Sequence, residues 1–79
     1  MDYDKSKVDE MTLALMHLTS FSEYGVTRSW KGYDWGAMER LHAAGFISNP
    51  VGKAKSIALT EEGKKRCDEL FQKHFSQSA

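Results

Sequence analysis

The chain has 79 residues and a formal net charge of zero, with 41% hydrophobic and 28% charged residues. This length allows one domain with one small core, and the composition excludes a disordered chain and a bilayer-spanning segment. The polar, acidic start is unlike a signal peptide, and a single cysteine leaves no internal disulfide. We therefore expect one soluble, cytoplasmic domain over residues 1–79, with a flexible tail at about 76–79.

The first predicted element is a helix over residues 5–19. Asp4 is suited to its N-cap, because a carboxylate accepts hydrogen bonds from the unpaired N–H groups of a first turn. Apolar residues recur along the helix at spacings of three and four: Val8, Met11, Leu15 and Leu18. This periodicity predicts that these side chains form the face packed into the core.

Residues 20–33 carry a mixed pattern. Phe21 and Tyr24 are compatible with more helix, Gly25 interrupts it, and residues 26–30 are compatible with a short strand. A helix-turn-helix motif needs a helix here, ahead of the recognition helix, and the segment is barely long enough and poorly helical. Its structure stays open at this point.

A second helix is predicted to begin after Asp34, a good N-cap, and to end at Gly45, which tolerates the left-handed conformation. Tyr33 and Met38 occupy the two positions of a hydrophobic staple. The inward face is expected to hold Trp35, Met38 and Leu41, with His42 beside it. The opposite face is expected to hold Gly36, Ala37, Arg40 and Ala43.

A β-hairpin, or wing, and a closing helix are predicted to follow. The arms of the hairpin are residues 46–48 and 56–59, and residues 49–53 supply Pro and Gly for the turn. Thr60 is a natural N-cap for the last helix, with Glu61 and Glu62 in its first turn. The inward face of that helix is expected to hold Cys67, Leu70, Phe71 and Phe75.

Two segments of this second half resemble known regulators. Residues 41–47 (LHAAGFI) and 59–63 (LTEEG) are similar to the segments that flank the wing of MarR-like and PadR-like winged-helix transcription regulators. Over its full length, the chain also resembles a small family of uncharacterised bacterial proteins, through MDYDK, WKGYDW, RLH and NPVGKAKS. The resemblances imply an α+β, winged-helix-like domain, mainly helical, with a two- or three-stranded antiparallel wing. They imply no particular activity.

Basic residues of the wing and recognition helix are candidates for nucleic-acid binding: Lys31, Arg40, Lys53 and Lys55. Lysines on a wing can contact phosphates, and an arginine on the helix can read a guanine edge. Charge is unevenly distributed along the chain. Residues 1–27 contain five acidic and two basic residues, whereas residues 49–66 contain five basic and two acidic residues, so the positive charge lies on the wing side. A neutral chain favours only weak contact with duplex DNA, and solubility of an exposed hairpin is the simpler explanation of these charges.

Aromatic residues at 30–35 form the second candidate surface. Trp30 and Tyr33 are the candidate protein-interaction residues, and at least one aromatic of the group is expected to be largely buried. Trp30 is expected to be the more exposed tryptophan, because Trp35 belongs to the inward stripe of its helix. The alternative function is therefore a protein-interaction module on a winged-helix scaffold, with a homodimer compatible with both hypotheses.

Catalytic and metal chemistry find no support in the sequence. The three histidines and Cys67 lack zinc-site spacing, so we expect no metal and no cofactor. Cys67 fits a small buried residue, and His42 fits the core edge with a backbone partner. Phosphate loops and nucleophile–base sets are absent, which predicts a non-enzymatic domain.

Overall fold

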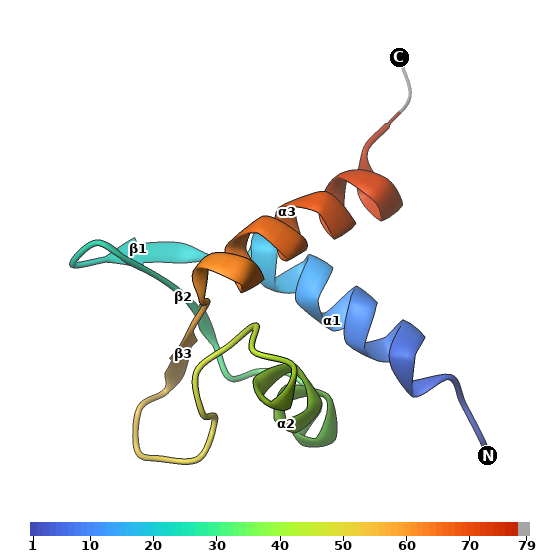
Figure 1. Ribbon diagram of the computed structural model, residues 1–79, viewed down its shortest axis with the longest axis horizontal. Coiled ribbons are helices and arrows are strands. Elements are labelled where there is room, and N and C mark those ends of the chain that lie inside the picture. Colours follow the sequence, from blue (N-terminus) through green and yellow to red (C-terminus); the bar gives the residue numbers. More distant parts are fainter. Residues whose placement is uncertain (78–79) are drawn as a thin grey trace.

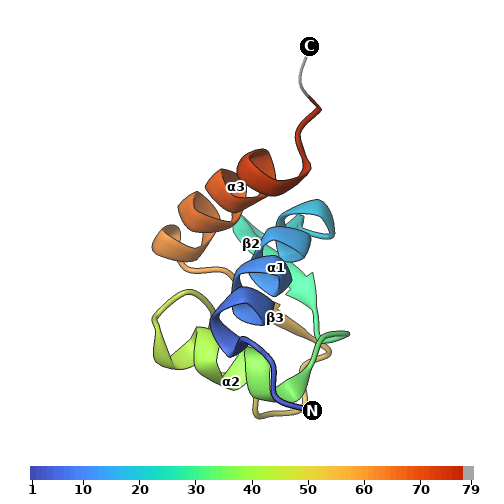
Figure 2. The same ribbon diagram turned by 90° about the vertical axis from the view of Figure 1, so that its right-hand side faces the viewer.

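A computed structural model describes residues 1–77 of the protein. That part contains three helices and a three-stranded antiparallel sheet: α1 (Lys5–Leu18), β1 (Phe21–Glu23), β2 (Val26–Trp30), α2 (Trp35–Ala43), β3 (Ser56–Ala58) and α3 (Glu61–Phe75). Helix α1 lies between α3 and α2, and the β1–β2 hairpin projects from the body (Figures 1 and 2). Of the expected flexible tail, residues 78–79 lie outside the described residues.

All three helices begin at the predicted N-caps. The capping side chain accepts a hydrogen bond from a backbone N–H at 3.1 Å for Asp4, 3.0 Å for Asp34 and 2.9 Å for Thr60. Gly45 follows α2 with φ +87°, the left-handed conformation that glycine adopts without steric cost. The local signals for helix ends are therefore confirmed.

The segment that the sequence left open forms the β1–β2 hairpin. Its two-residue turn has positive φ at both positions, 52° at Tyr24 and 78° at Gly25, the geometry that matches the twist of paired strands. Strand β2 lies in the centre of the sheet and pairs with β3 on its other side. Only residues 31–34 separate β2 from α2, so the element directly before α2 is a strand and not the helix that a helix-turn-helix motif requires.

The predicted wing is only partly present. The return arm pairs with β2 on one side and with residues 46–48 on the other, through an isolated bridge from Ile47 to Leu59. Backbone hydrogen bonds flank this bridge, from Ser48 N to Ala58 O at 2.8 Å and from Thr60 N to Phe46 O at 3.0 Å. The predicted antiparallel pairing of the two arms is therefore confirmed around Ile47, while the pairing of β3 with β2 was not predicted. The chain leaves the sheet after Ser48 because Pro50 is buried and cannot donate to a ladder, and because Asn49 Oδ1 accepts from Val51 N at 2.9 Å.

The face of α1 that packs into the core also differs from the prediction. Leu15 is 38% exposed and Leu18 is 63% exposed, while Leu13 and Met16 are fully buried. Thr12 can join the buried face because its hydroxyl donates to Val8 O at 2.7 Å, which satisfies the polar group within the helix. The helix therefore carries apolar residues on two sides, and periodicity selected the wrong one.

The inward faces of α2 and α3 are confirmed in part. Met38 and Leu41 are buried in α2, and Cys67 and Leu70 are buried in α3. Trp35 and Phe75 are exposed instead, as is Ala43 on the predicted outer face. Ala37, expected outside, is fully buried.

Tyr33 explains part of this arrangement. Its ring packs against the core cluster, and its hydroxyl lies 2.8 Å from Thr19 Oγ1. Tyr33 therefore contributes an aromatic ring to the core, whereas Trp35 is 47% exposed. The same Thr19 hydroxyl lies 3.0 Å from Ser29 Oγ, which gives the fully buried serine of β2 a partner.

Candidate functional site

Three of the four candidate nucleic-acid residues gather at one end of the sheet. Lys31 follows β2, and its backbone N donates to Lys55 O at 3.0 Å while its Nζ donates to Gly52 O at 3.3 Å. These bonds hold residue 31 against the segment that contains Lys53 and Lys55. We call residues 49–55 the lysine loop; it is the long loop that ends at β3 in Figure 1.

The lysine loop has an internal anchor and a one-sided charge. Its anchor is the buried Pro50, next to the turn that Asn49 stabilises. Both loop lysines are exposed, and residues 40–60 contain no acidic side chain. The loop therefore presents positive charge without an ion-pair partner in its own segment, which is the chemistry that phosphate groups recognise.

Arg40, the fourth candidate, does not join this group. Its Nε and Nη2 donate to the two carboxylate oxygens of Asp9, each at 2.8 Å. These hydrogen bonds to the Asp9 carboxylate raise the pKa of Arg40 above its ordinary value. The guanidinium thus connects α2 to α1, and base reading would first have to break a bidentate pair.

The aromatic candidates have different environments. Trp30 is 56% exposed and Trp35 is 47% exposed, so Trp30 is the more exposed tryptophan, as expected. At least one aromatic residue of this group was expected to be largely buried, and this prediction was wrong. Both tryptophans are exposed, and Tyr33 is only half-buried. The ring of Trp30 lies 4.8 Å from that of Phe21 (centroid to centroid), which orients it on the sheet.

Arg28 is a basic residue beside this surface that the sequence reasoning did not select. It alternates with Ser29 along β2 and so shares the outer face of the sheet with Trp30. Its guanidinium donates to Ser56 Oγ at 2.7 Å and to Ser56 O at 3.0 Å. The alternation of residues 26–30 was the available signal, but it is informative only once β2 is known to be a strand.

A second group of reactive side chains surrounds Cys67, in a pocket of about 230 Å³. Cys67 Sγ lies 3.8 Å from His17 Nδ1, and His17 Nε2 lies 3.7 Å from Asp68 Oδ1. Catalytic cysteines have the same sequence of contacts, from thiol to histidine to carboxylate, and they react as the thiolate. Here the thiol is buried and donates to Lys64 O at 3.2 Å, and burial raises its pKa. The geometry thus favours the neutral thiol and a packing role.

This raised pKa predicts a pH dependence of stability. The unfolded thiol ionises at lower pH than the native one, so the free energy of unfolding should be unaffected below the unfolded pKa and should fall as pH rises above it. Denaturant titrations of wild type and Cys67→Ala at about pH 7 and about pH 9.5 should show a larger alkaline loss in the wild type. Equal losses in both proteins would contradict the neutral, buried thiol.

The remaining polar candidates have structural partners. His42 Nδ1 lies 3.4 Å from Ile47 O, which agrees with the predicted backbone partner, although the residue is exposed.

Across residues 1–77, no group of three His, Cys, Asp or Glu side chains is arranged to hold a metal ion. No helix in the same range is long and apolar enough to cross a membrane.

The described residues thus form a small α+β domain with three helices and a three-stranded antiparallel sheet, and with the lysine loop at one end of that sheet. The chain belongs to the family described as "Domain of unknown function (DUF6429)", which matches residues 4–77. It is similar to the uncharacterized protein y4hR of Sinorhizobium fredii (strain NBRC 101917 / NGR234), with 44% identity over 77 residues, covering 98% of this chain and 100% of that protein. No solved structure matches the chain. The resemblance to a small uncharacterised bacterial family is confirmed by these matches.

Proposed function

We propose that the domain is a small, non-enzymatic, cytoplasmic protein of winged-helix-like design that binds nucleic acid weakly through the lysine loop. The observation that carries the proposal is the pair of hydrogen bonds from Lys31 to residues 52 and 55. They place three lysines together beside an exposed tryptophan. Lysine supplies phosphate contacts and tryptophan supplies a stacking surface, the two contributions that sequence-tolerant binding requires.

The winged-helix-like assignment rests on the order of the elements when β1 is left out. Helix α1 is followed by β2, α2, residues 46–48, β3 and α3, and β3 lies between β2 and Ile47 in the sheet. In this comparison α2 takes the place of the recognition helix, and the lysine loop takes the place of the wing tip. The helix that should precede α2 is replaced by residues 31–34.

The exposed surface of α2 favours contact with the nucleic-acid backbone over base reading. Its exposed residues are Trp35, Glu39, His42 and Ala43. None of these carries the bidentate donor group that commonly reads guanine, and Arg40 is already bound to Asp9. Affinity would then come mainly from phosphate contacts and depend on salt more than on sequence.

The test is fluorescence anisotropy with a labelled DNA duplex at several salt concentrations. Three phosphate contacts predict a slope of log K against log salt of about −2.7, or a roughly 40-fold loss of affinity between about 50 and 200 mM. The triple variant Lys31→Gln/Lys53→Gln/Lys55→Gln, called the lysine-loop variant because Lys31 is bound to that loop, should abolish most binding and flatten the slope. Arg40→Gln should retain the wild-type slope if the fold survives.

A matched control removes the same charge elsewhere. Lys5, Lys7 and Lys65 are exposed helix residues outside the lysine loop, and replacing all three with glutamine changes the net charge equally. The proposal requires this control to bind far better than the lysine-loop variant. Equal losses in the two triple variants would reduce the interaction to net charge, and the proposed site would be rejected.

The exposure of both tryptophans favours a second candidate, a protein-interaction module that associates with a second copy of the chain. Its surface would be the outer face of the hairpin, where Phe21 contacts Trp30 and Tyr24 is fully exposed. Sedimentation at increasing concentration should then show association that Trp30→Ala removes and the lysine-loop variant keeps. The converse pattern would exclude this candidate.

A further inference from the structure

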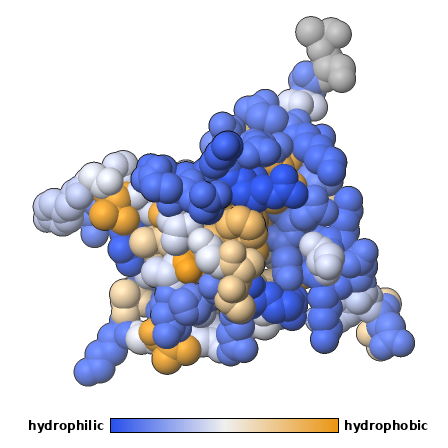
Figure 3. Space-filling view, in the orientation of Figure 1, coloured by the Kyte–Doolittle hydropathy of each residue, from blue (hydrophilic) through white to orange (hydrophobic). Residues whose placement is uncertain are grey.

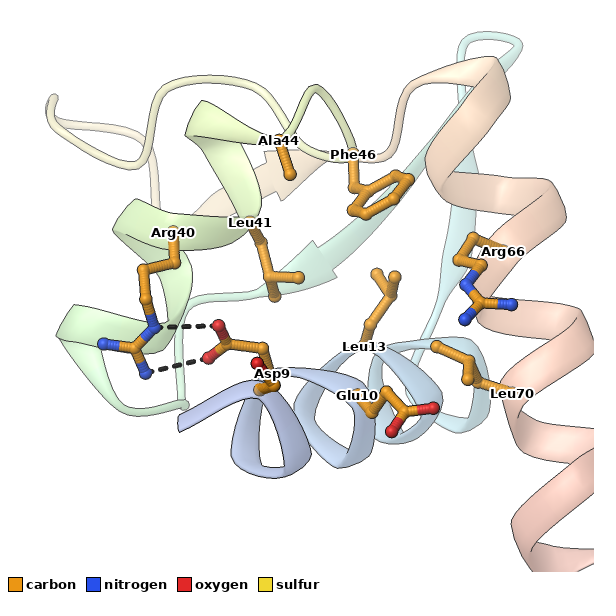
Figure 4. A pocket seen from close by; sticks show the side chains of 10 residues that line it. Asp9, Glu10, Leu13, Arg40, Leu41, Ala44, Phe46, Arg66 and Leu70 are labelled. Atoms are coloured by element: carbon orange, nitrogen blue, oxygen red, sulfur yellow. Dashed lines mark hydrogen bonds and ion pairs between the residues drawn. The ribbon is translucent and has the colours of Figure 1, made fainter. Parts of the chain in front are cut away.

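A pocket of about 270 Å³ opens between α1, α2 and α3, away from the residues of the lysine loop. Its floor is apolar and comes from all three helices and the segment after α2: Leu13, Leu41, Ala44, Phe46 and Leu70. In Figure 4 the Arg40–Asp9 pair stands on one side of this floor, and Glu10 and Arg66 stand on the other. On the face seen in Figure 3, hydrophilic side chains predominate, and a band of apolar side chains reaches the surface between α3 and α2.

The charged side chains on the two sides of the pocket differ in how many hydrogen bonds they make. Asp9 and Arg40 bind each other through two hydrogen bonds of 2.8 Å, so each neutralises the other. Glu10 Oε1 lies 3.9 Å from Lys73 Nζ and 3.6 Å from His74 Nε2, both too long for hydrogen bonds. The buried His74 Nε2 makes no hydrogen bond within the described residues.

Arg66 also has only a long ion pair within the described residues. Its closest acidic partner is Glu69, at 3.9 Å from Nη1 to Oε2 one helical turn away. An arginine fork normally binds a carboxylate through two parallel hydrogen bonds, and Arg66 makes no such pair in residues 1–77. The pocket therefore has an exposed arginine without a bidentate partner and a weakly bound carboxylate beside the same apolar floor.

We propose that this pocket binds a free α-amino acid with a large apolar side chain, such as leucine or phenylalanine. Arg66 would hold the α-carboxylate, Glu10 would hold the α-ammonium group, and the side chain would lie over the floor against Ala44 and Phe46, its more exposed members. A pocket of about 270 Å³ suits one small molecule of this kind. It lies below the roughly 300–1,000 Å³ of sites that bury drug-sized ligands.

The charge pattern selects a zwitterion over simpler ligands. A plain carboxylic acid would satisfy Arg66 but bring a second negative charge next to Glu10. A plain amine would satisfy Glu10 but bring a second positive charge next to Arg66. An uncharged apolar molecule would cover the floor and leave both charged groups partly desolvated without a partner. This inference is independent of nucleic-acid binding, because it uses none of the lysine-loop residues.

The experiment is an NMR titration of the ¹⁵N-labelled full chain with L-leucine and L-phenylalanine up to about 10 mM, a range that detects millimolar affinity. Saturable shifts should appear in backbone amides around the pocket. Three truncated probes separate the groups: 4-methylpentanoate lacks the ammonium, 3-methylbutylamine lacks the carboxylate, and glycine lacks the side chain. Each should bind at least about tenfold more weakly than leucine.

Variants connect the shifts to the proposed residues. Arg66→Gln and Glu10→Gln should each weaken leucine binding at least about tenfold. Lys65→Gln, a neighbouring charge change on α3 outside the pocket, should leave it unchanged. Circular dichroism at the titration temperature confirms that each variant is folded. No saturable shift with either amino acid, equal binding of leucine and 4-methylpentanoate, or unchanged affinity in both pocket variants would overturn the proposal.

Discussion

Gly63→Ala should destabilise the domain by about 3 kcal/mol or more, the upper range of overpacking costs. A Cβ at this position would lie 1.9 Å from the carbonyl oxygen of Phe46 and 2.8 Å from its carbonyl carbon. These are backbone atoms, so no side-chain rotation relieves the clash. The same carbonyl accepts from Thr60 N at 3.0 Å, and moving it would weaken the start of α3.

Urea denaturation followed by circular dichroism measures this effect, with Gly32→Ala as the matched control. A Cβ at Gly32 would meet no atom within 4 Å, so its replacement should change the free energy of unfolding by less than about 1 kcal/mol. Similar midpoints for the two variants would show that α3 does not approach Phe46 as closely as described. The glycine of the LTEEG segment would then need another explanation.

Leu13→Ala should cost about 3 kcal/mol, while Leu18→Ala should cost less than about 1 kcal/mol. The chemical change is identical on the same helix. Leu13 is fully buried beside α3, whereas Leu18 is 63% exposed. A domain of this size is expected to have about 4 to 12 kcal/mol of total stability, so the first change removes a large share of it.

Thermal and urea unfolding of both leucine variants distinguish the two possible faces of α1. The structure requires a large loss for Leu13 and a small one for Leu18. Helical periodicity predicts Leu18 in the core and Leu13 outside it, so a larger loss for Leu18 than for Leu13 would favour the face predicted from periodicity. A large loss in both would indicate that Leu18 is covered in solution, as in a dimer.

The parts of the fold that were predicted correctly depend on neighbouring residues. An N-cap forms between a side chain and an N–H three residues later, so Asp4, Asp34 and Thr60 were recognisable from the sequence. Gly45 was recognisable because left-handed helix ends select glycine. The positions of Lys53 and Lys55 in an exposed loop followed from the adjacent Pro and Gly.

The failures involve partners that are distant in sequence. The side of α1 that is buried depends on where α2 and α3 pack, which helical periodicity does not specify. Strand β3 pairs with β2, so Arg28 lies opposite Ala58. The β1–β2 turn begins with Tyr24 at positive φ, a conformation that tyrosine rarely adopts, so the usual Asn-Gly or Asp-Gly signal was missing.

The candidate site shows the same division. Arg40 was a reasonable DNA contact while its helix was considered alone, but its bidentate partner Asp9 lies 31 residues away. Lys31 joins the lysine loop through bonds that span 21 and 24 residues, which no local pattern records. Neither the pocket beside Arg66 nor its charge arrangement could be seen until three separate helices were in place.

The lysine loop also divides the chain into two interdependent pieces. Before it lie α1, β1, β2 and α2, and after it lie β3 and α3, yet α1 packs on α3 and β2 pairs with β3. A protease cleaving after an exposed lysine of the loop would therefore cut the backbone without separating the structure. We expect the two fragments to remain associated through these contacts, with the proposed phosphate contacts interrupted. We therefore expect a single cleavage to abolish the proposed nucleic-acid binding while the proposed amino-acid pocket stays assembled.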